Sequence, residues 1–129
     1  MIAKIDDMTT LNSDAGPRPK LDAETARAAQ SFLRHLAERY PVREAILFGS
    51  RARHTHGPDS DADIAVVLDG AHGDRTAAAL DMAGIAFTVM METGVMVEAL
   101  PLWADDLERP GAFRNPGLLE HIRREGVRL

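Results

Sequence analysis

The chain has 129 residues, 45% of them hydrophobic and 27% charged, which is enough for one domain with one core and short for two. Its formal net charge of -5 argues against direct nucleic-acid binding through bulk electrostatics, because phosphate backbones are attracted to basic faces. Cysteine is absent, which excludes disulfides and thiolate catalysis and removes the commonest sulfur ligand of zinc.

The N-terminal segment, residues 1–20, mixes polar residues and prolines without an apolar period, so it predicts a flexible arm ahead of a domain over residues 21–129. Asp6 and Asp7 stand where a signal peptide would need an apolar stretch. The longest apolar-rich stretch, residues 77–91, falls short of the roughly 20 apolar residues that cross a bilayer. We therefore expect a soluble cytoplasmic protein.

Residues 21–40 predict the first helix of the domain. Apolar side chains recur there every three or four residues, which places them on one helical face. Asp22 is a suitable N-cap, and Pro41 ends the helix. The short apolar run at residues 45–48 then predicts a buried strand that ends at Gly49.

The next segments alternate between short elements and turns. Residues 50–53 predict a short helix or turn, and residues 54–60, which contain glycine and proline, predict a loop. Residues 64–68 are rich in β-branched side chains and predict a second strand, with a turn at residues 69–70.

The second half of the chain predicts two more helices around a third strand. Residues 76–91 form an alanine-rich helix that stops at Gly94, and residues 95–100 form a strand that Pro101 closes. An irregular stretch follows. The last helix has Asn115 as its cap, Pro116 at its first position and Gly126 at its end. This order of elements predicts an α/β (α+β) fold in which a small mixed β-sheet packs against helices.

Asp61 and Asp63 are the first candidate functional residues. Side chains alternate between the faces of a strand, so these two carboxylates point the same way while Ile64 and Val66 point to the other side. Their repulsion raises a pKa and costs stability unless a cation lies between them, and oxygen ligands suit Mg2+ or Mn2+. The alternative is a solvated acidic loop, which fits an isolated Asp-x-Asp motif more often than a metal site does.

Gly49 and Ser50 form the second candidate motif. A glycine directly after a buried strand lets the backbone approach a ligand closely, and the free N–H groups of the following turn attract phosphate. The serine hydroxyl adds another donor. The alternative is an ordinary turn at the end of a strand.

The two motifs together carry a family resemblance. Residues 51–60 separate Gly49-Ser50 from Asp61-Ala62-Asp63, which gives the GS-x10-DxD pattern of the DNA polymerase β-like nucleotidyltransferase superfamily. The stretches FGSRAR and SDADIAVV resemble its minimal nucleotidyltransferase (MNT) domains, antitoxins of the MntA type that are often encoded beside a HEPN-type toxin. The closing EHIRREGVRL also resembles the tail of these proteins.

The resemblance implies a role for each residue of the two motifs. Gly49 and Ser50 would hold the triphosphate of a nucleotide, and Asp61 and Asp63 would hold the metal ions. The nucleotidyltransferase fold and ATP as the substrate are implied in the same way.

Two arginines and a histidine in the turn also match the pattern. Arg51 and Arg53 correspond to the arginines of the family's GSRARG version, and they would touch phosphates or the acceptor. The alternative for both is a solvated basic turn. His54 stands where the family often has glycine, which leaves the local path of the loop in question.

Glu98 is the candidate for a third carboxylate. The superfamily usually has one on a later strand beside the pair, and Glu98 lies in the predicted third strand among apolar residues. The family more often has aspartate there. The alternative is an edge-strand residue that faces water.

Three methionines and the tryptophan have simpler explanations. Met90, Met91 and Met96 are expected to fill the core. Trp103 either covers an edge of the core or stacks on a base.

The resemblance implies a Mg2+-dependent or Mn2+-dependent enzyme that transfers AMP from ATP to an acceptor hydroxyl. The acceptor would lie on a partner HEPN-type toxin, with the chain acting as its antitoxin, and a homo-oligomer is a further option. Asp61, Asp63 and Glu98 would be the catalytic metal ligands. The alternative is a binding module of the same fold that has lost catalysis and neutralises a partner by contact. Glu98 separates the two, because a second metal is poorly held without a third acid.

Overall fold

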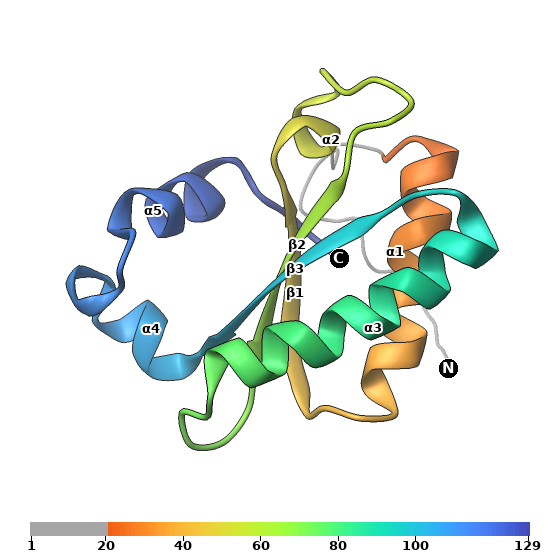
Figure 1. Ribbon diagram of the computed structural model, residues 1–129. Helices are drawn as coiled ribbons and strands as arrows, with labels where there is room; N and C mark the ends of the chain where they lie inside the picture. The colour runs from red at the N-terminus through yellow and green to blue at the C-terminus, as the bar shows by residue number, and fades with distance from the viewer. Residues whose placement is uncertain (1–20) are drawn as a thin grey trace, which may run out of the picture.

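Four strands in one sheet and a set of helices make up residues 21–129, the part of the chain that the computed structural model describes (Figure 1). In chain order they are α1 (Ala23–Ala37), β1 (Val42–Phe48), α2 (Ser50–Arg53), β2 (Ala62–Leu68), α3 (Arg75–Thr93), β3 (Val97–Trp103), α4 (Ala104–Glu108), the 3-10 helix η2 (Pro110–Ala112), α5 (Pro116–Glu125) and β4 (Val127–Arg128). The arm expected at residues 1–20 lies outside the described residues.

The sheet is mixed, with the strand order β3-β2-β1-β4. β1 runs antiparallel to both β2 and β4, whereas β2 and β3 run parallel and are joined through α3. The register places Phe48 opposite Asp63, and Asp63 opposite Glu98. The sequence-based prediction of a small mixed sheet packed against helices is therefore confirmed.

Helices cover both faces of the sheet, with α1 and α3 on one side and α4 and α5 on the other (Figure 1). Ile64 and Val66 of β2 belong to the core beneath α1 and α3. Ala65 and Val67 pack with residues of α5 in a second core on the opposite face. Because side chains alternate along a strand, Asp63 lies on the α5 side of the sheet.

Three of the predicted helix caps are confirmed, whereas α1 ends at Ala37, before the predicted end at Tyr40. The Asp22 carboxylate accepts a hydrogen bond from the backbone N–H of Thr25 at 3.1 Å, and the Asn115 side chain accepts one from Leu118 at 3.2 Å. Gly94 ends α3 in the left-handed conformation, with φ of 83°, which glycine adopts without steric cost.

The third strand is longer than predicted, because it continues through Pro101 to Trp103. β3 lies at the edge of the sheet and pairs with β2 alone, so the proline costs no ladder bond on a second side. The stretch expected to be irregular also contains α4 and η2, and the final strand β4 was not predicted.

The outer side of α3 departs from the expected burial. Met90 and Met91 are 41% and 73% exposed, so the prediction that they fill the core is wrong. Met96 packs partly buried against the core, as expected. Among residues 21–129, no helix combines the length and the hydropathy that a membrane span requires.

Candidate active site

The turn after β1 packs directly against Asp63. Gly49 has φ of 77°, and a Cβ atom added there would overlap the Asp63 Oδ2 atom. Both the backbone conformation and the close approach therefore require glycine. Ser50 follows as the first residue of α2 and is half-buried. The structure thus brings the Gly-Ser turn and the second carboxylate of the Asp-x-Asp motif into contact.

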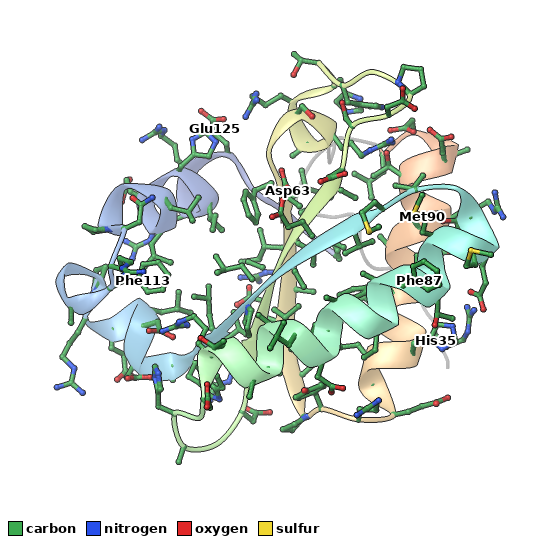
Figure 2. The ribbon with its side chains drawn as sticks, in the orientation of Figure 1. His35, Asp63, Phe87, Met90, Phe113 and Glu125 are labelled. Carbon is green, nitrogen blue, oxygen red and sulfur yellow. The ribbon has the colours of Figure 1, made fainter. Side chains whose placement is uncertain are left out.

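Asp63 lies at the end of the sheet next to α2 (Figure 2), and the register places Glu98 beside it. Asp61 immediately precedes β2, and Asp63 lies within it opposite Glu98 of β3. Neighbouring strands run about 4.8 Å apart, so Asp63 and Glu98 are close neighbours on the same face. Asp63 is half-buried, whereas Asp61 and Glu98 are exposed.

Asp63 is held in an unfavourable environment for its own charge. Burial raises the pKa of its carboxyl, and the negative charges of Glu98 and Asp61 and a hydrogen bond shared with Glu98 raise it further, to about 6. The Arg53 guanidinium opposes this rise in pKa. A cation beside Asp63 would relieve the repulsion, and a set of carboxylate oxygens suits Mg2+ or Mn2+.

A tighter cluster of possible metal ligands lies elsewhere in the fold. Among residues 21–129, His72, Asp105 and Asp106 form the group of three whose ligand atoms all lie within 4.8 Å of one another. The ligand atoms of Asp61, Asp63 and Glu98 are not all this close to one another.

The groups of this second cluster are already bonded to protein. Asp106 accepts hydrogen bonds from Arg75 at 2.8 and 3.1 Å and from the backbone N–H of Trp103 at 2.9 Å. His72 Nδ1 lies 2.9 Å from both carboxylate oxygens of Asp105. A metal ion would have to displace Arg75, so we interpret this cluster as an ion-pair network. Trp103 is buried beneath it and covers the core.

Arg51 differs from both sequence-based expectations. Its side chain is fully buried, so the solvated alternative is wrong. The guanidinium donates to the carbonyl oxygen of Ser60 at 2.9 Å and to the Thr25 hydroxyl at 2.8 Å. These donors tie the loop that leads to Asp61 onto α1, and they are not free for phosphate. This burial corrects the expectation that Arg51 touches the nucleotide.

Arg53 remains next to the candidate site. Its side chain is about half exposed, and its Nη1 atom lies 3.4 Å from His121 Nε2 and 3.8 Å from Glu125 Oε1. His121 and Glu125 were not among the predicted site residues, although their spacing of four places them on one helical face. Arg53 thus opposes the rise in the pKa of Asp63 and also approaches Glu125 at the end of α5.

The two histidines of the following loop take different positions. His54 ends α2 with φ of 59°, a left-handed conformation that explains why glycine is common there in similar proteins. His56 Nε2 lies 3.3 Å from Asp22 Oδ1, so this side chain attaches the loop to the start of α1.

A mixed sheet that packs a Gly-Ser turn against paired carboxylates is the arrangement of a nucleotidyl-transfer domain. Residues 29–97, more than half of the 129, match the family model of the nucleotidyltransferase domain, and the chain belongs to this family. The matched segment contains both motifs and ends one residue before Glu98.

The chain is similar to solved structures. One of them is a protein from Sulfolobus solfataricus described as a "putative nucleotidyltransferase", with 23% sequence identity and a TM-score of 0.49. The similarity covers 73% of this chain and 83% of the other. No curated protein matches the chain.

Proposed function

We propose that the protein transfers AMP from ATP to an acceptor hydroxyl and releases pyrophosphate. The observation that carries this proposal is the contact between the Gly49-Ser50 turn and Asp63, a carboxylate whose pKa is raised by burial and by Glu98 and Asp61. Membership of the family supports nucleotidyl transfer in general. The choice of ATP, the metal and the acceptor belong to the proposal.

Asp61, Asp63 and Glu98 are the residues that would hold Mg2+ or Mn2+. Their oxygen atoms are the preferred ligands of these ions, and the raised pKa of Asp63 supports a cation there. A divalent ion, when bound, neutralises phosphate charge and lowers the pKa of the attacking hydroxyl. Asp63 must be ionised to contribute, which favours activity above pH 6.

The chain's own groups would position the triphosphate. The absence of a side chain at Gly49 leaves the backbone N–H groups of the turn accessible, and the Ser50 hydroxyl would donate to a phosphate oxygen. Arg53 would add a charged donor, since its guanidinium is partly exposed. These interactions align the α-phosphorus for in-line attack, so positioning and charge stabilisation supply the catalysis.

The transfer itself forms one bond and breaks one. The acceptor oxygen would bond to the α-phosphorus as the bond to the pyrophosphate oxygen breaks, and the pyrophosphate leaves with the electron pair. Glu98 would receive the hydroxyl proton, because its carboxylate is exposed on the edge strand beside Asp63.

The exposed position of Asp61 and Glu98 favours an acceptor carried by a macromolecule. A groove of about 240 Å³ lies between α5 and the sheet near Ile46 and Leu119, and none of the three carboxylates lines it. Together with the resemblance to minimal nucleotidyltransferases, this openness supports a hydroxyl on a HEPN-type toxin as the acceptor.

The test is incubation of the full chain with α-labelled ATP, Mg2+ and a HEPN-type toxin encoded beside it, with Asp63→Asn as the control. We expect the toxin to be labelled by the parent chain and not by Asp63→Asn. Ser50→Ala should raise the Kd for ATP roughly tenfold, the loss expected for one hydrogen bond to a charged group. A toxin that is neutralised without label, by parent and variant alike, would identify a binding module without catalysis.

A further inference from the structure

The outer side of α3 exposes large apolar side chains along most of its length. Figure 2 labels two of them, Phe87 and Met90. The exposed fractions are 71% for Leu80, 59% for Phe87, 41% for Met90 and 73% for Met91. Single exposed apolar residues are ordinary, but a continuous row on one helix marks an interaction surface.

The charged residues of α3 do not face this row. Asp81 accepts a hydrogen bond from the Tyr40 hydroxyl at 2.6 Å, and Glu92 accepts one from Ser31 at 2.6 Å, so both point toward the α1 side. Arg75, at the start of the helix, is bonded to Asp106 as described above. A partner could therefore cover the row without burying the charges of α3, and next to Gly84 and Thr88 it would meet His35, Glu38 and Arg39 of α1.

Gly84 lies in the middle of the row and has no explanation within one copy of the chain. A Cβ atom added there would meet no atom within 4 Å, and the backbone is not in the left-handed region. A glycine inside a helix lowers stability relative to alanine. The close approach of another helix would account for it.

The spacing of the apolar residues along α3 indicates that the approaching helix is α3 of a second copy. Ala77, Leu80, Gly84, Phe87 and Met91 follow one another at intervals of three and four residues, the repeat of a coiled-coil contact, and we call this set the α3 seam. The seam is also complementary in size about the point between residues 85 and 86, because the related positions 80 and 91 are both large while 84 and 87 pair a glycine with a phenylalanine. In an antiparallel pair, Leu80 meets Met91 and the Phe87 ring lies over Gly84, in both directions.

We propose that a second copy of the chain packs its α3 seam antiparallel against the first, across a two-fold axis near residues 85 and 86. The four exposed side chains would bury on the order of 500 Å² per copy, against about 800 Å² per partner in a standard interface. Ala77, Ala83 and Thr88 border them and add to this area. An interface of this size falls at the low end of the range, where transient complexes are found. It does not depend on the proposed nucleotide transfer.

The first test uses Gly84→Leu. Analytical ultracentrifugation of the full chain across the micromolar range measures the dimer Kd, which should rise at least tenfold in the variant because the side chain fills the space of the Phe87 ring. The thermal midpoint of the dilute variant should not fall, since the site is open in one copy. Gly111→Leu is the matched control, because an added Cβ there also meets no atom within 4 Å and η2 lies outside the seam. It should leave the Kd unchanged.

The second test determines the orientation of the two helices. The chain has no cysteine, so Leu80→Cys and Met91→Cys each introduce a single thiol. On mild oxidation, a mixture of the two variants should form the 80–91 disulfide between copies faster than either variant alone forms its own dimer.

Three results would overturn the proposal. A full chain that stays monomeric at all concentrations means that another segment or another protein covers the seam. A dimer that Gly84→Leu leaves intact lies on a different surface. Disulfides between identical positions in preference to the 80–91 pair would exclude the antiparallel arrangement.

Discussion

The parallel strands β2 and β3 carry acidic residues near both of their ends, and the two groups differ in their counter-charges. At the first residues of the strands, Asp63 lies between Asp61 and Glu98, and its pKa is raised to about 6. Beyond the last residues, a hydrogen bond from His72 lowers the pKa of Asp105, and Asp106 is bonded twice to Arg75. The same residue type therefore meets opposite environments at the two ends of one strand pair.

This difference separates a candidate functional site from a structural one. Asp105 and Asp106 receive their partners, His72 and Arg75, from the protein itself, so both carboxylates are hydrogen-bonded within the fold. Asp63 has only the opposing influence of Arg53, so its charge is left for a ligand to compensate. A perturbed carboxylate with unmatched charge is a better indicator of function than a dense cluster of acids.

The largest expected effect is on catalysis, at the end of β2 and β3 that carries Asp63 and that we call the unmatched end. Asp63→Asn should lower nucleotide transfer by at least roughly a thousandfold, because a neutral amide cannot hold a divalent ion. Asp105→Asn should leave the rate unchanged. The two rates are measured with α-labelled ATP under the same conditions, and equal losses in both variants would show that the ends do not differ in function.

The next effect is on stability, at the opposite end, where Asp105 and Asp106 have partners within the protein and which we call the matched end. Asp106→Asn should lower the free energy of unfolding by about 3 kcal/mol, because it leaves Arg75 partly buried without its counter-charge. Replacing both partners with Arg75→Met and Asp106→Leu should cost less than this single change. Urea denaturation measures both, and a loss below about 0.5 kcal/mol for Asp106→Asn would contradict a structural role.

Glu98 tests whether the unmatched end acts as a group of three carboxylates. Glu98→Gln should slow transfer roughly a hundredfold while leaving the Kd for ATP nearly unchanged, because the group would act mainly on the attacking hydroxyl. Glu108→Gln, an exposed glutamate near the other end, is the control. Parent-like transfer by the Glu98 variant would refute the three-carboxylate mechanism.

The pH dependence of stability should have opposite signs at the two ends. The pKa of Asp63 is higher in the fold than its ordinary value of 3.8, so its ionisation destabilises the fold as the pH rises from about 4 to about 6. Asp105 has a lowered pKa, so its stabilising contribution is present above its ordinary value and is lost as the pH falls through the lowered pKa.

Without divalent cations at pH 7, Asp63→Asn should therefore be more stable than the parent by about 1 to 2 kcal/mol, a figure reduced because the carboxyl is partly solvent-screened. The difference should vanish below pH 4. Asp105→Asn should instead be less stable than the parent at pH 7, with a gap that narrows in acid. Urea titrations from pH 3 to pH 8 measure the stability of each variant relative to the parent. If this difference changes with pH in the same direction for both variants, the two ends do not have opposite environments.

Local signals in the sequence were sufficient for the fold class and for most helix ends. Asp22, Gly94 and Asn115 determine those ends through short-range hydrogen bonds or backbone conformation, which single residues specify. The end of β3 was predicted wrongly, because a proline interrupts a central strand but is accepted at the edge of a sheet. The position of a strand within the sheet is a property of the whole chain.

The two arginines of α2 show why the candidate site was only partly predictable. Arg51 and Arg53 lie two residues apart, yet one is buried against Thr25 of α1 and the other approaches Glu125 of α5. Both outcomes depend on contacts with residues distant in the sequence. Met91 was misplaced for a related reason, since α3 is apolar on all sides and periodicity does not identify the face that is buried.

The pairing of β4 with β1 has a consequence for the order in which the molecule is assembled. Residues 127 and 128 pair with Leu47 and Ile46, and the Leu129 N–H donates to Ala45, so the last residues of this sequence fasten α5 to a strand made some 80 residues earlier. A nascent chain that has emerged from the ribosome only as far as β3 already holds Asp61, Asp63 and Glu98. Arg53 gains its neighbours His121 and Glu125 only once translation has passed β4, so this side of the candidate site is completed last.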